Sequence, residues 1–270
     1  MPVTYDFSGR TAIVTGGSRG IGRAIAGQLV ESGANVWVWD IEPAELAGAR
    51  TLTVDVARRE DIASTLAAMK VDAVDILVND AGYLGSYRPF EQFDPAEWQR
   101  IVSVNLLGMF EVTHQVLPLM RRRGSGRIVN LGSLAGGLPG LAAYSAASAG
   151  VIAFTKALSR EICDTDIRIN CVAPGPIDTR MIRDLGNEVV DAMITASPLR
   201  RLGDPQEVAG LVLWLCSERA ILIYIRSFRI YRISTKSSDY ARFKRQAPHE
   251  NSGWNCRIHY CRWYISGRQI

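Results

Sequence analysis

The sequence predicts a single α/β domain in three layers, with a doubly wound parallel sheet between two layers of helices. Short apolar runs alternate with segments of helical periodicity through residues 11–218, which is typical of parallel strands joined by crossover helices. A glycine-rich turn joins the first apolar run directly to the first helical segment. The length of 270 residues suits one domain of this kind.

The expected strands are short apolar runs rich in Val, Ile and Leu and bounded by glycine or polar residues. They lie near residues 11–15, 35–40, 51–54, 74–79, 127–132 and 167–172. The expected helices are segments in which apolar residues return every three or four positions. They cover residues 21–32, 58–69, 95–122, 143–163 and 205–217.

The third expected helix carries sequence signals at both ends. Asp94 can cap its first N–H groups, and Pro95 suits the first helical position. Three arginines at 121–123 precede Gly124, a pattern typical of a helix C-terminus. The alternative interpretation of the arginines is a nucleic-acid patch, but the helix end explains them better, and we expect no nucleic-acid partner.

The turn within residues 11–22 indicates a ligand class. Gly16, Gly20 and Gly22 let the backbone turn sharply and let a bound group approach without Cβ clashes. The helix that follows directs free N–H groups and the positive end of its dipole at that group, which suits a pyrophosphate. A plain strand-to-helix turn is the alternative for the glycine run taken alone. With its context, the turn predicts a dinucleotide site.

Asp40 indicates which dinucleotide is bound. It ends the second expected strand, about 20 residues beyond the glycines, where a carboxylate accepts hydrogen bonds from the adenosine ribose and repels a 2′-phosphate. Arg19 argues the other way, since a cation there could hold a 2′-phosphate, although it could equally be a solvated loop cation. The like-charge penalty at Asp40 favours NAD over NADP.

Over about residues 7–219 the chain resembles the short-chain dehydrogenase/reductase family, whose members have a Rossmann-type fold. Motifs in the family's order carry the resemblance: the Thr15-Gly16-x3-Gly20-x-Gly22 turn, Asp55-Val56, Asn79-Asp80-Ala81-Gly82, Asn105, Ser133, Tyr144 and residues 174–179. Asp80 stands where the family has a second asparagine. Each motif alone could be a strand end, a turn or a core residue, but their joint order is specific.

The resemblance implies the roles of the site residues. Tyr144 would be the acid/base, Ser133 would hydrogen-bond the substrate oxygen, and Asn105 would support the proton relay. The implied contacts to the dinucleotide come from Gly16, Ser18, Arg19, Gly20, Ile21, Gly22, Asp40, Asp55, Val56, Asn79, Ala81, Gly82, Tyr144, Pro174, Gly175, Ile177 and Thr179.

Ser148 is the main departure from the family pattern. It stands one helical turn after Tyr144, on the same helix face, where the family has a lysine that holds the nicotinamide ribose. Serine can still bond a ribose hydroxyl, but it lacks the charge that lowers a neighbouring pKa by about 1–3 units. Lys156 lies about 12 Å further along the helix, too far to substitute. The segment between Ser133 and Tyr144 is also shorter than usual, which leaves their relative placement open.

The sequence therefore predicts NAD(H)-dependent oxidation of a secondary alcohol or sugar-like polyol, or reduction of the ketone, with activity reduced by Ser148. The alternative is a non-catalytic NAD(P)-binding sensor or interaction protein. Residues 180–201 mix apolar and charged side chains and predict a partly apolar lid over the pocket. By resemblance, we expect a homo-oligomer, a tetramer or dimer, formed through helices 95–122 and 143–163.

The C-terminal residues differ in composition from the rest. Residues 219–270 hold 11 Lys+Arg against 2 Asp+Glu, whereas the whole chain has a net charge of only +4, so the preceding part is acidic. We predict an NAD-binding catalytic domain at 1–219 and an atypical basic tail at 220–270, with the family's usual last strand missing or remade by that tail. A shifted reading frame would explain the tail, and a tether to nucleic acid or an acidic surface is the rival hypothesis.

Composition also bears on location and on metals. The first six residues are polar and acidic, and no apolar run approaches the ~18–20 residues of a membrane span, so we expect a cytoplasmic protein with no membrane partner. The five cysteines and three histidines are scattered, without the spacing of a metal site. We therefore expect free thiols in a reducing compartment and no metal.

Overall fold

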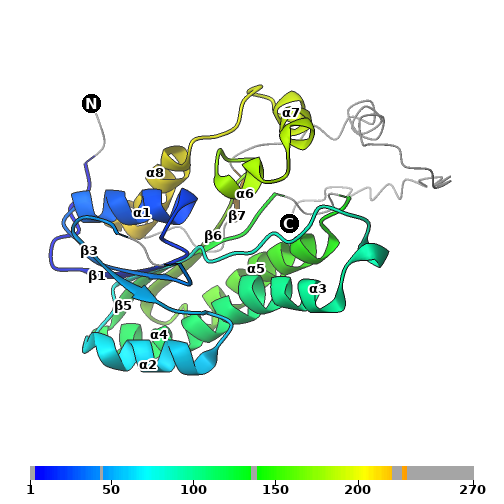
Figure 1. Cartoon of the computed structure of the whole chain (residues 1–270). Helices are drawn as coiled ribbons and strands as arrows, with labels where there is room; N and C mark the ends of the chain where they lie inside the picture. The colour runs from blue at the N-terminus through cyan, green and yellow to red at the C-terminus, as the bar shows by residue number, and fades with distance from the viewer. Residues whose placement is uncertain (1–3, 43–44, 135–138, 221–226, 230–270) are drawn as a thin grey trace, which may run out of the picture. The chain divides into compact units, whose positions relative to one another are not determined.

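A computed structural model describes residues 4–42, 45–134, 139–220 and 227–229 (Figure 1). Within these ranges, seven strands form one parallel sheet in the order β3-β2-β1-β4-β5-β6-β7. The strands are β1 (Thr11–Thr15), β2 (Asn35–Asp40), β3 (Ala49–Thr53), β4 (Ile76–Asn79), β5 (Ser125–Leu131), β6 (Asp166–Ala173) and β7 (Ser227–Arg229). The predicted doubly wound α/β fold is confirmed, and the first six strands lie within one or two residues of their expected bounds.

The strand order places a ligand crevice. The chain runs outward from β1 to β3 and then returns to β4 on the other side of β1. In parallel sheets, the carboxyl ends of the strands at such a reversal border a crevice that no connection fills. Thr15 and Asn79, the last residues of β1 and β4, lie side by side in the strand register at this point.

Two helical layers cover the sheet, as Figure 1 shows. Helices α1 (Gly20–Glu31) and α8 (Pro205–Cys216) pack together on one face. Helices α2 (Arg59–Met69), α4 (Met109–Arg123) and α5 (Ala142–Glu161) cover the other face, and α3 (Pro95–Val102) packs against α5. The short helices α6 (Arg180–Arg183) and α7 (Asn187–Ala196) occupy the segment expected to be a lid, and 3-10 turns cover Phe90–Gln92 and Glu218–Ala220.

The central strands are apolar because both of their faces are buried. In β1, Val14 packs into the cluster formed with α1 and α8, whereas its neighbour Ile13 packs into the cluster formed with α2, α4 and α5. In β4, Val78 and Leu77 divide in the same way. Successive side chains point to opposite faces of a strand, so a strand covered on both sides reads as a continuous apolar run.

The expected single helix over 95–122 is interrupted, which corrects the prediction. A π-helical segment, Ser103–Gly108, separates α3 from α4. Gly108, the last residue of this segment, lies so close to the loop after β3 that an added Cβ would lie 2.8 Å from the carbonyl oxygen of Val56. The expected signals do hold at the outer ends: Asp94 accepts a hydrogen bond from the N–H of Ala96 at 2.8 Å, and α4 ends before Gly124.

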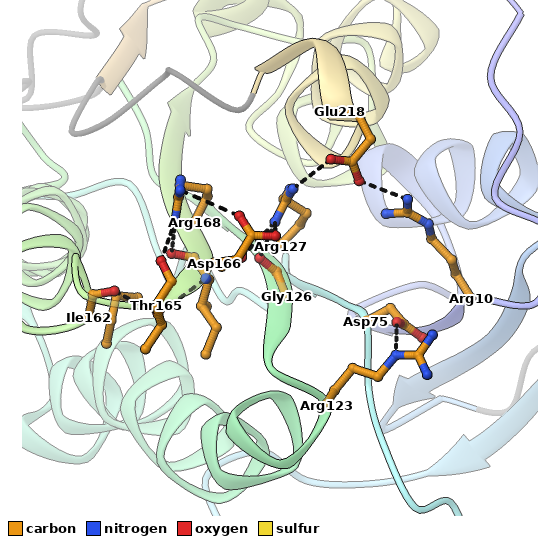
Figure 2. A network of polar contacts seen from close by, with 11 residues as sticks. Arg10, Asp75, Arg123, Gly126, Arg127, Ile162, Thr165, Asp166, Arg168 and Glu218 are labelled. Carbon is orange, nitrogen blue, oxygen red and sulfur yellow. Dashed lines mark hydrogen bonds and ion pairs between the residues drawn. The ribbon is translucent and has the colours of Figure 1, made fainter.

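A polar network lies at the amino ends of the central strands, away from the crevice (Figure 2). The side chain of Arg127 in β5 is 3% exposed, and its guanidinium bonds Glu218 at 3.1 Å and the carbonyl oxygen of Asp166 at 2.8 Å. Glu218 also bonds Arg10 at 2.8 Å. A buried charge is costly unless it is paired, so these contacts fix the turn at Glu218 to the start of β5.

The basic tail lies mostly outside the described residues. Strand β7 falls within it and pairs in parallel with β6, from Cys171 beside Ser227 to Ala173 beside Arg229. The remaining tail residues, 221–226 and 230–270, lie outside the described part of the chain. In the ranges that are described, no helix is long and apolar enough to cross a membrane.

Candidate active site

The glycine-rich turn after β1 is packed tightly against the loop after β4. Gly16 has φ +69°, and a Cβ on it would lie 2.8 Å from the backbone of Ala81. A Cβ on Gly22 would lie 2.4 Å from the carbonyl oxygen of Gly16. Both positions therefore require glycine, because any larger residue would displace the backbone. Gly20, at φ +57°, faces the Cγ2 of Thr179, which would lie 3.2 Å from an added Cβ.

The first turn of α1 fits a phosphate group. Arg19 at the N-cap is extended and its side chain makes no capping bond within the described part of the chain, and no acidic residue follows in the first turn. By contrast, Asp94 and Asp204 cap α3 and α8 with their side chains. An uncapped helix N-terminus beside close-packed glycines is the arrangement that binds pyrophosphates, so these residues fit the dinucleotide that the sequence predicts.

Two carboxylates stand at the carboxyl end of β2. Asp40 accepts hydrogen bonds from the N–H and hydroxyl of Ser18, at 3.0 and 2.6 Å, and from the N–H of Glu42 at 3.1 Å. Glu42 forms an ion pair with Arg19. The arginine that could have held a 2′-phosphate is thus paired with an acid. Glu42 was not among the predicted site residues, although an acid two residues beyond Asp40 indicates a second carboxylate at the end of this strand.

Other expected cofactor residues lie around the ends of β3 and β4. Asp55 accepts a hydrogen bond from the N–H of Ala57 at 2.9 Å, and Val56 beside it is buried. The amide of Asn79 donates to Thr113 at 3.1 Å and to Asn130 at 2.8 Å. The Asn79 side chain therefore joins the interior between β4, β5 and α4, and its structural role was not evident from the sequence.

Thr15 joins the loop after β4 to β1. Its hydroxyl accepts hydrogen bonds from the N–H groups of Asp80 and Ala81, both at 3.1 Å. The carboxyl of Asp80 in turn accepts a hydrogen bond from the N–H of Gly22 in α1. Burial raises the pKa of Asp80 well above its ordinary value, the Gly22 bond opposes this rise, and the negative charge of Asp40 adds to it.

Tyr144, Ser133 and Ser148 meet at the carboxyl edge of the sheet. Tyr144 lies in the first turn of α5, Ser148 follows one turn later, and Ser133 comes from the loop after β5. Hydrogen bonds join the phenol of Tyr144 to both serine side chains. The short segment between Ser133 and Tyr144 thus still brings them together, although residues 135–138 within it are not described.

The surroundings of Tyr144 favour its neutral form. The ring packs against the apolar cluster of Phe93, Ile101 and Ala143. Burial raises the pKa of Tyr144 above its ordinary value, and the negative charge of Asp80 raises it further, whereas the bonds to the two serines lower it in part. No lysine stands at position 148, and Lys156 is exposed. The phenol therefore holds its proton at neutral pH.

Asn105 lies in the π-helical segment and holds the loop after β4. Its side-chain oxygen accepts from the N–H of Tyr83 at 2.7 Å, and its amide donates to the Tyr83 carbonyl oxygen at 2.9 Å. This paired contact fixes the backbone beside Gly82, whose added Cβ would lie 3.9 Å from Asn105. The described contacts make Asn105 a positioning residue for this loop.

The loop after β6 closes the site from the other side. The carbonyl oxygen of Pro174 accepts from the N–H of Leu134 at 3.0 Å, next to Ser133, and Gly175 follows it. Ile177 is buried and forms a β-bridge to Gly203. In α6, the Cε of Met181 would lie 4.0 Å from a Cβ on Gly82, so this helix reaches over the loop after β4.

Comparison with known proteins identifies similar chains. The family described as enoyl-(acyl carrier protein) reductase matches residues 16–226. The chain is 37% identical over 225 residues to a 3-oxoacyl-(acyl-carrier-protein) reductase of Chlamydia trachomatis, covering 77% of this chain and 90% of that protein. It is 35% identical over 223 residues to the NAD(+)-dependent 2-dehydro-3-deoxy-L-rhamnonate dehydrogenase of a Sphingomonas species, covering 78% and 90%.

A solved structure shares the architecture. The crystal structure of 3-ketoacyl-(acyl-carrier-protein) reductase from Brucella melitensis complexed with NADH matches with a TM-score of 0.77 and 28% identity. The match covers 83% of this chain and 97% of that one.

Proposed function

This chain belongs to the short-chain dehydrogenase/reductase family, and we propose that it is an NAD-dependent enzyme that interconverts a secondary alcohol and a ketone. The family relation makes it a nicotinamide-dependent oxidoreductase that acts on CH–OH or keto groups. We further propose that the cofactor is NAD, and we propose a substrate class and a role for each site residue.

The observation that carries the proposal is the contact of three hydroxyl groups at one point. The phenol of Tyr144 is bonded to Ser133 and Ser148, and the uncapped start of α1 with its glycines lies at the same edge of the sheet. A carbonyl oxygen placed beside Tyr144 and Ser133 would meet two O–H donors. Such donors stabilise the negative charge that develops on oxygen as a carbonyl is reduced.

The division of labour follows from this placement. The first turn of α1 and Thr179 would hold the pyrophosphate, and a bound nicotinamide would supply or accept the hydride. Tyr144 would give a proton to the substrate oxygen, or take one from it, and Ser133 would orient that oxygen. Ser148 would bond the phenol and reach a ribose hydroxyl. Asn105 would hold the loop that borders the substrate.

The acidic end of β2 supports NAD as the cofactor. Asp40 and Glu42 would face the adenosine ribose, and a 2′-phosphate there would meet two carboxylates. Arg19, the nearby cation, is already paired with Glu42. Like-charge contacts of this kind are unfavourable, so we propose that NADP binds more weakly than NAD.

A secondary alcohol, a sugar-like polyol or the corresponding ketone would enter beneath α6 and α7, where Met181 offers an apolar contact. We also propose a homo-oligomer, a tetramer or dimer, formed through residues 95–122, which span α3 to α4, and residues 143–163 in and after α5. Light scattering of the purified chain tests the assembly.

The competing function is a non-catalytic NAD(P)-binding sensor, which the serine at position 148 favours. Calorimetry with NADH, followed by turnover assays on a panel of ketones and alcohols, separates the two. The enzyme is expected to bind NADH and turn over at least one substrate. Tyr144→Phe, the matched control, should keep NADH binding and lose about 10²–10⁴ in kcat. Saturable binding of NADH without turnover of any substrate would favour the sensor.

A further inference from the structure

We infer that this site is built for carbonyl reduction at neutral pH, with Tyr144 acting as a neutral phenol that donates its proton, because among the described residues no group that contacts the phenol is a cation able to hold a phenolate. The inference rests on the proposed function and adds the direction of the reaction, which the sequence alone left open.

The first support is the set of groups that touch the phenol. Ser133 and Ser148 are its hydrogen-bond partners, and both are uncharged. Ser148 is 5% exposed and occupies the position at which the family has a lysine. Tyr144 also packs against the apolar cluster of Phe93, Ile101 and Ala143. These neighbours can bond a phenol, but they supply no positive charge to a phenolate.

The second support is the charge of the surrounding elements. Asp80, from the loop after β4, acts on the phenol, and its charge is negative. On α3, which packs against α5, Glu97 accepts from the N–H of Ser86 at 2.6 Å and Arg100 lies over the ring of Tyr83. Both charges of α3 are thus engaged elsewhere. Residues 135–138, which precede α5, are Ala-Gly-Gly-Leu and carry no ionisable side chain.

The third support is the chemistry. In reduction, the carbonyl carbon gains a hydride from the reduced cofactor, with its two electrons, and the carbonyl oxygen gains the proton of Tyr144. The phenolate that remains recovers a proton from water. Oxidation of an alcohol needs the phenolate at the start. For a phenol of pKa about 10 or higher, that form is at most about one part in a thousand at pH 7.

The pH dependence of the two directions follows. The phenol is present below its pKa and is lost above it, so reduction should stay flat from pH 6 to about 9. Oxidation should rise about tenfold per pH unit and should not level off below about pH 10. Because reduction consumes one proton, the ratio of kcat/KM for reduction to kcat/KM for oxidation must fall tenfold per pH unit. A flat reduction profile and a tenfold rise of oxidation per pH unit satisfy this requirement.

The test measures kcat/KM for reduction and for oxidation across this pH range. Ethyl acetoacetate and ethyl 3-hydroxybutyrate are the first substrate pair, and a pair from the panel of ketones and alcohols replaces them if they are not turned over. A flat reduction profile with steadily rising oxidation is the expected result. Turnover in which oxidation levels off near neutral pH would overturn the inference and leave the proposed function standing. Lack of turnover in either direction would overturn the proposed function instead.

A second readout does not depend on turnover. Tyrosinate absorbance of the native chain, minus that of Tyr144→Phe, gives the titration of Tyr144 without cofactor. Its midpoint should lie above the ordinary tyrosine value of about 10. A midpoint below that value would contradict the inference whether or not the protein turns over.

Charge variants locate the cause. Ser148→Lys should lower the Tyr144 midpoint by about 1–3 pH units and make oxidation level off at a lower pH. Ala146→Lys places the same charge on the exposed side of α5 and should leave both unchanged. If Ser148→Lys does not fold, Asp80→Asn should lower the midpoint by removing the negative neighbour. Unchanged midpoints in Ser148→Lys and Asp80→Asn would count against the inference.

Discussion

The carboxyl group of Asp80 accepts a hydrogen bond from the backbone N–H of Gly22. This contact joins the loop after β4 to the first turn of α1, at the crevice where the dinucleotide is proposed to bind. An asparagine at position 80 could make the same bond without a charge. The carboxyl instead places a half-buried acid beside the first turn of α1, where its charge acts on Tyr144.

Asp80→Asn is expected to stabilise the protein at neutral pH. Because burial holds the pKa of Asp80 above its unfolded value, its contribution to stability is full below the unfolded pKa and is lost as pH rises through the folded pKa. The variant should gain on the order of 1 kcal/mol at pH 7, and the gain should vanish near pH 3–4. Urea unfolding at the two pH values measures both. An equal gain at both pH values would assign it to packing rather than to charge.

The same variant should bind NADH more tightly at high pH. An ionised Asp80 would repel the pyrophosphate, so the native Kd should weaken as pH rises through the pKa of Asp80, whereas the Kd of Asp80→Asn should stay level. Calorimetric titration at several pH values tests this. Parallel pH dependence in the two proteins would show that Asp80 does not act on the cofactor.

The acidic pair at β2 is expected to set cofactor preference. Asp40→Ser combined with Glu42→Ala removes both carboxylates and frees Arg19 from its ion pair. The NADPH/NADH ratio of kcat/KM should rise at least about tenfold, since close like charges cost more than about 1.4 kcal/mol. Glu45→Ala removes an exposed acid nearby and is the control. Should the ratio rise equally in the control, net charge would be the cause.

Asn105→Asp tests the positioning of the loop after β4. The carboxylate can still accept from the N–H of Tyr83, but it cannot donate to the Tyr83 carbonyl oxygen, a bond of 2.9 Å in the native protein. We expect a loss of about 1–2 kcal/mol in stability and a larger fall in kcat than in NADH affinity. Thermal unfolding and steady-state kinetics measure these. A variant with native kcat would show that the contacts of Asn105 with Tyr83 do not affect catalysis.

Arg127→Met tests the network at the amino ends of the strands. Removal of this buried cation leaves Glu218 with Arg10 as its remaining partner and leaves the carbonyl oxygen of Asp166 without the Arg127 donor, and stability should fall by about 1–3 kcal/mol. Arg123→Met removes the exposed partner of Asp75, which keeps its hydrogen bond from the N–H of Thr11, and should cost only about 1 kcal/mol. NADH affinity of the folded variant should be unchanged, because the network lies at the other edge of the sheet. A large loss of affinity would contradict that separation.

The sequence was most informative where local chemistry decides structure. Strand and helix positions followed from apolar periodicity, because the strands are buried on two faces and the helices on one. The start of α3 followed from Asp94 and Pro95, whose capping is local. The interruption by the π-helical segment did not follow, and the contacts made by its residues, Asn105 with Tyr83 and Gly108 with Val56, join parts of the chain that are distant in sequence.

The sequence by itself determined the family, the α/β fold and the residues that come to the carboxyl edge of the sheet, because these depend on glycine geometry, apolar pattern and motif order. Only the tertiary structure decided how those residues are engaged. In the structure, Tyr144 is hydrogen-bonded to Ser133 and Ser148. Arg19 forms an ion pair with Glu42, and the carboxyl of Asp80 accepts a hydrogen bond from the N–H of Gly22. The physical reason is that hydrogen bonds and charge effects depend on distances between strands that are remote in sequence.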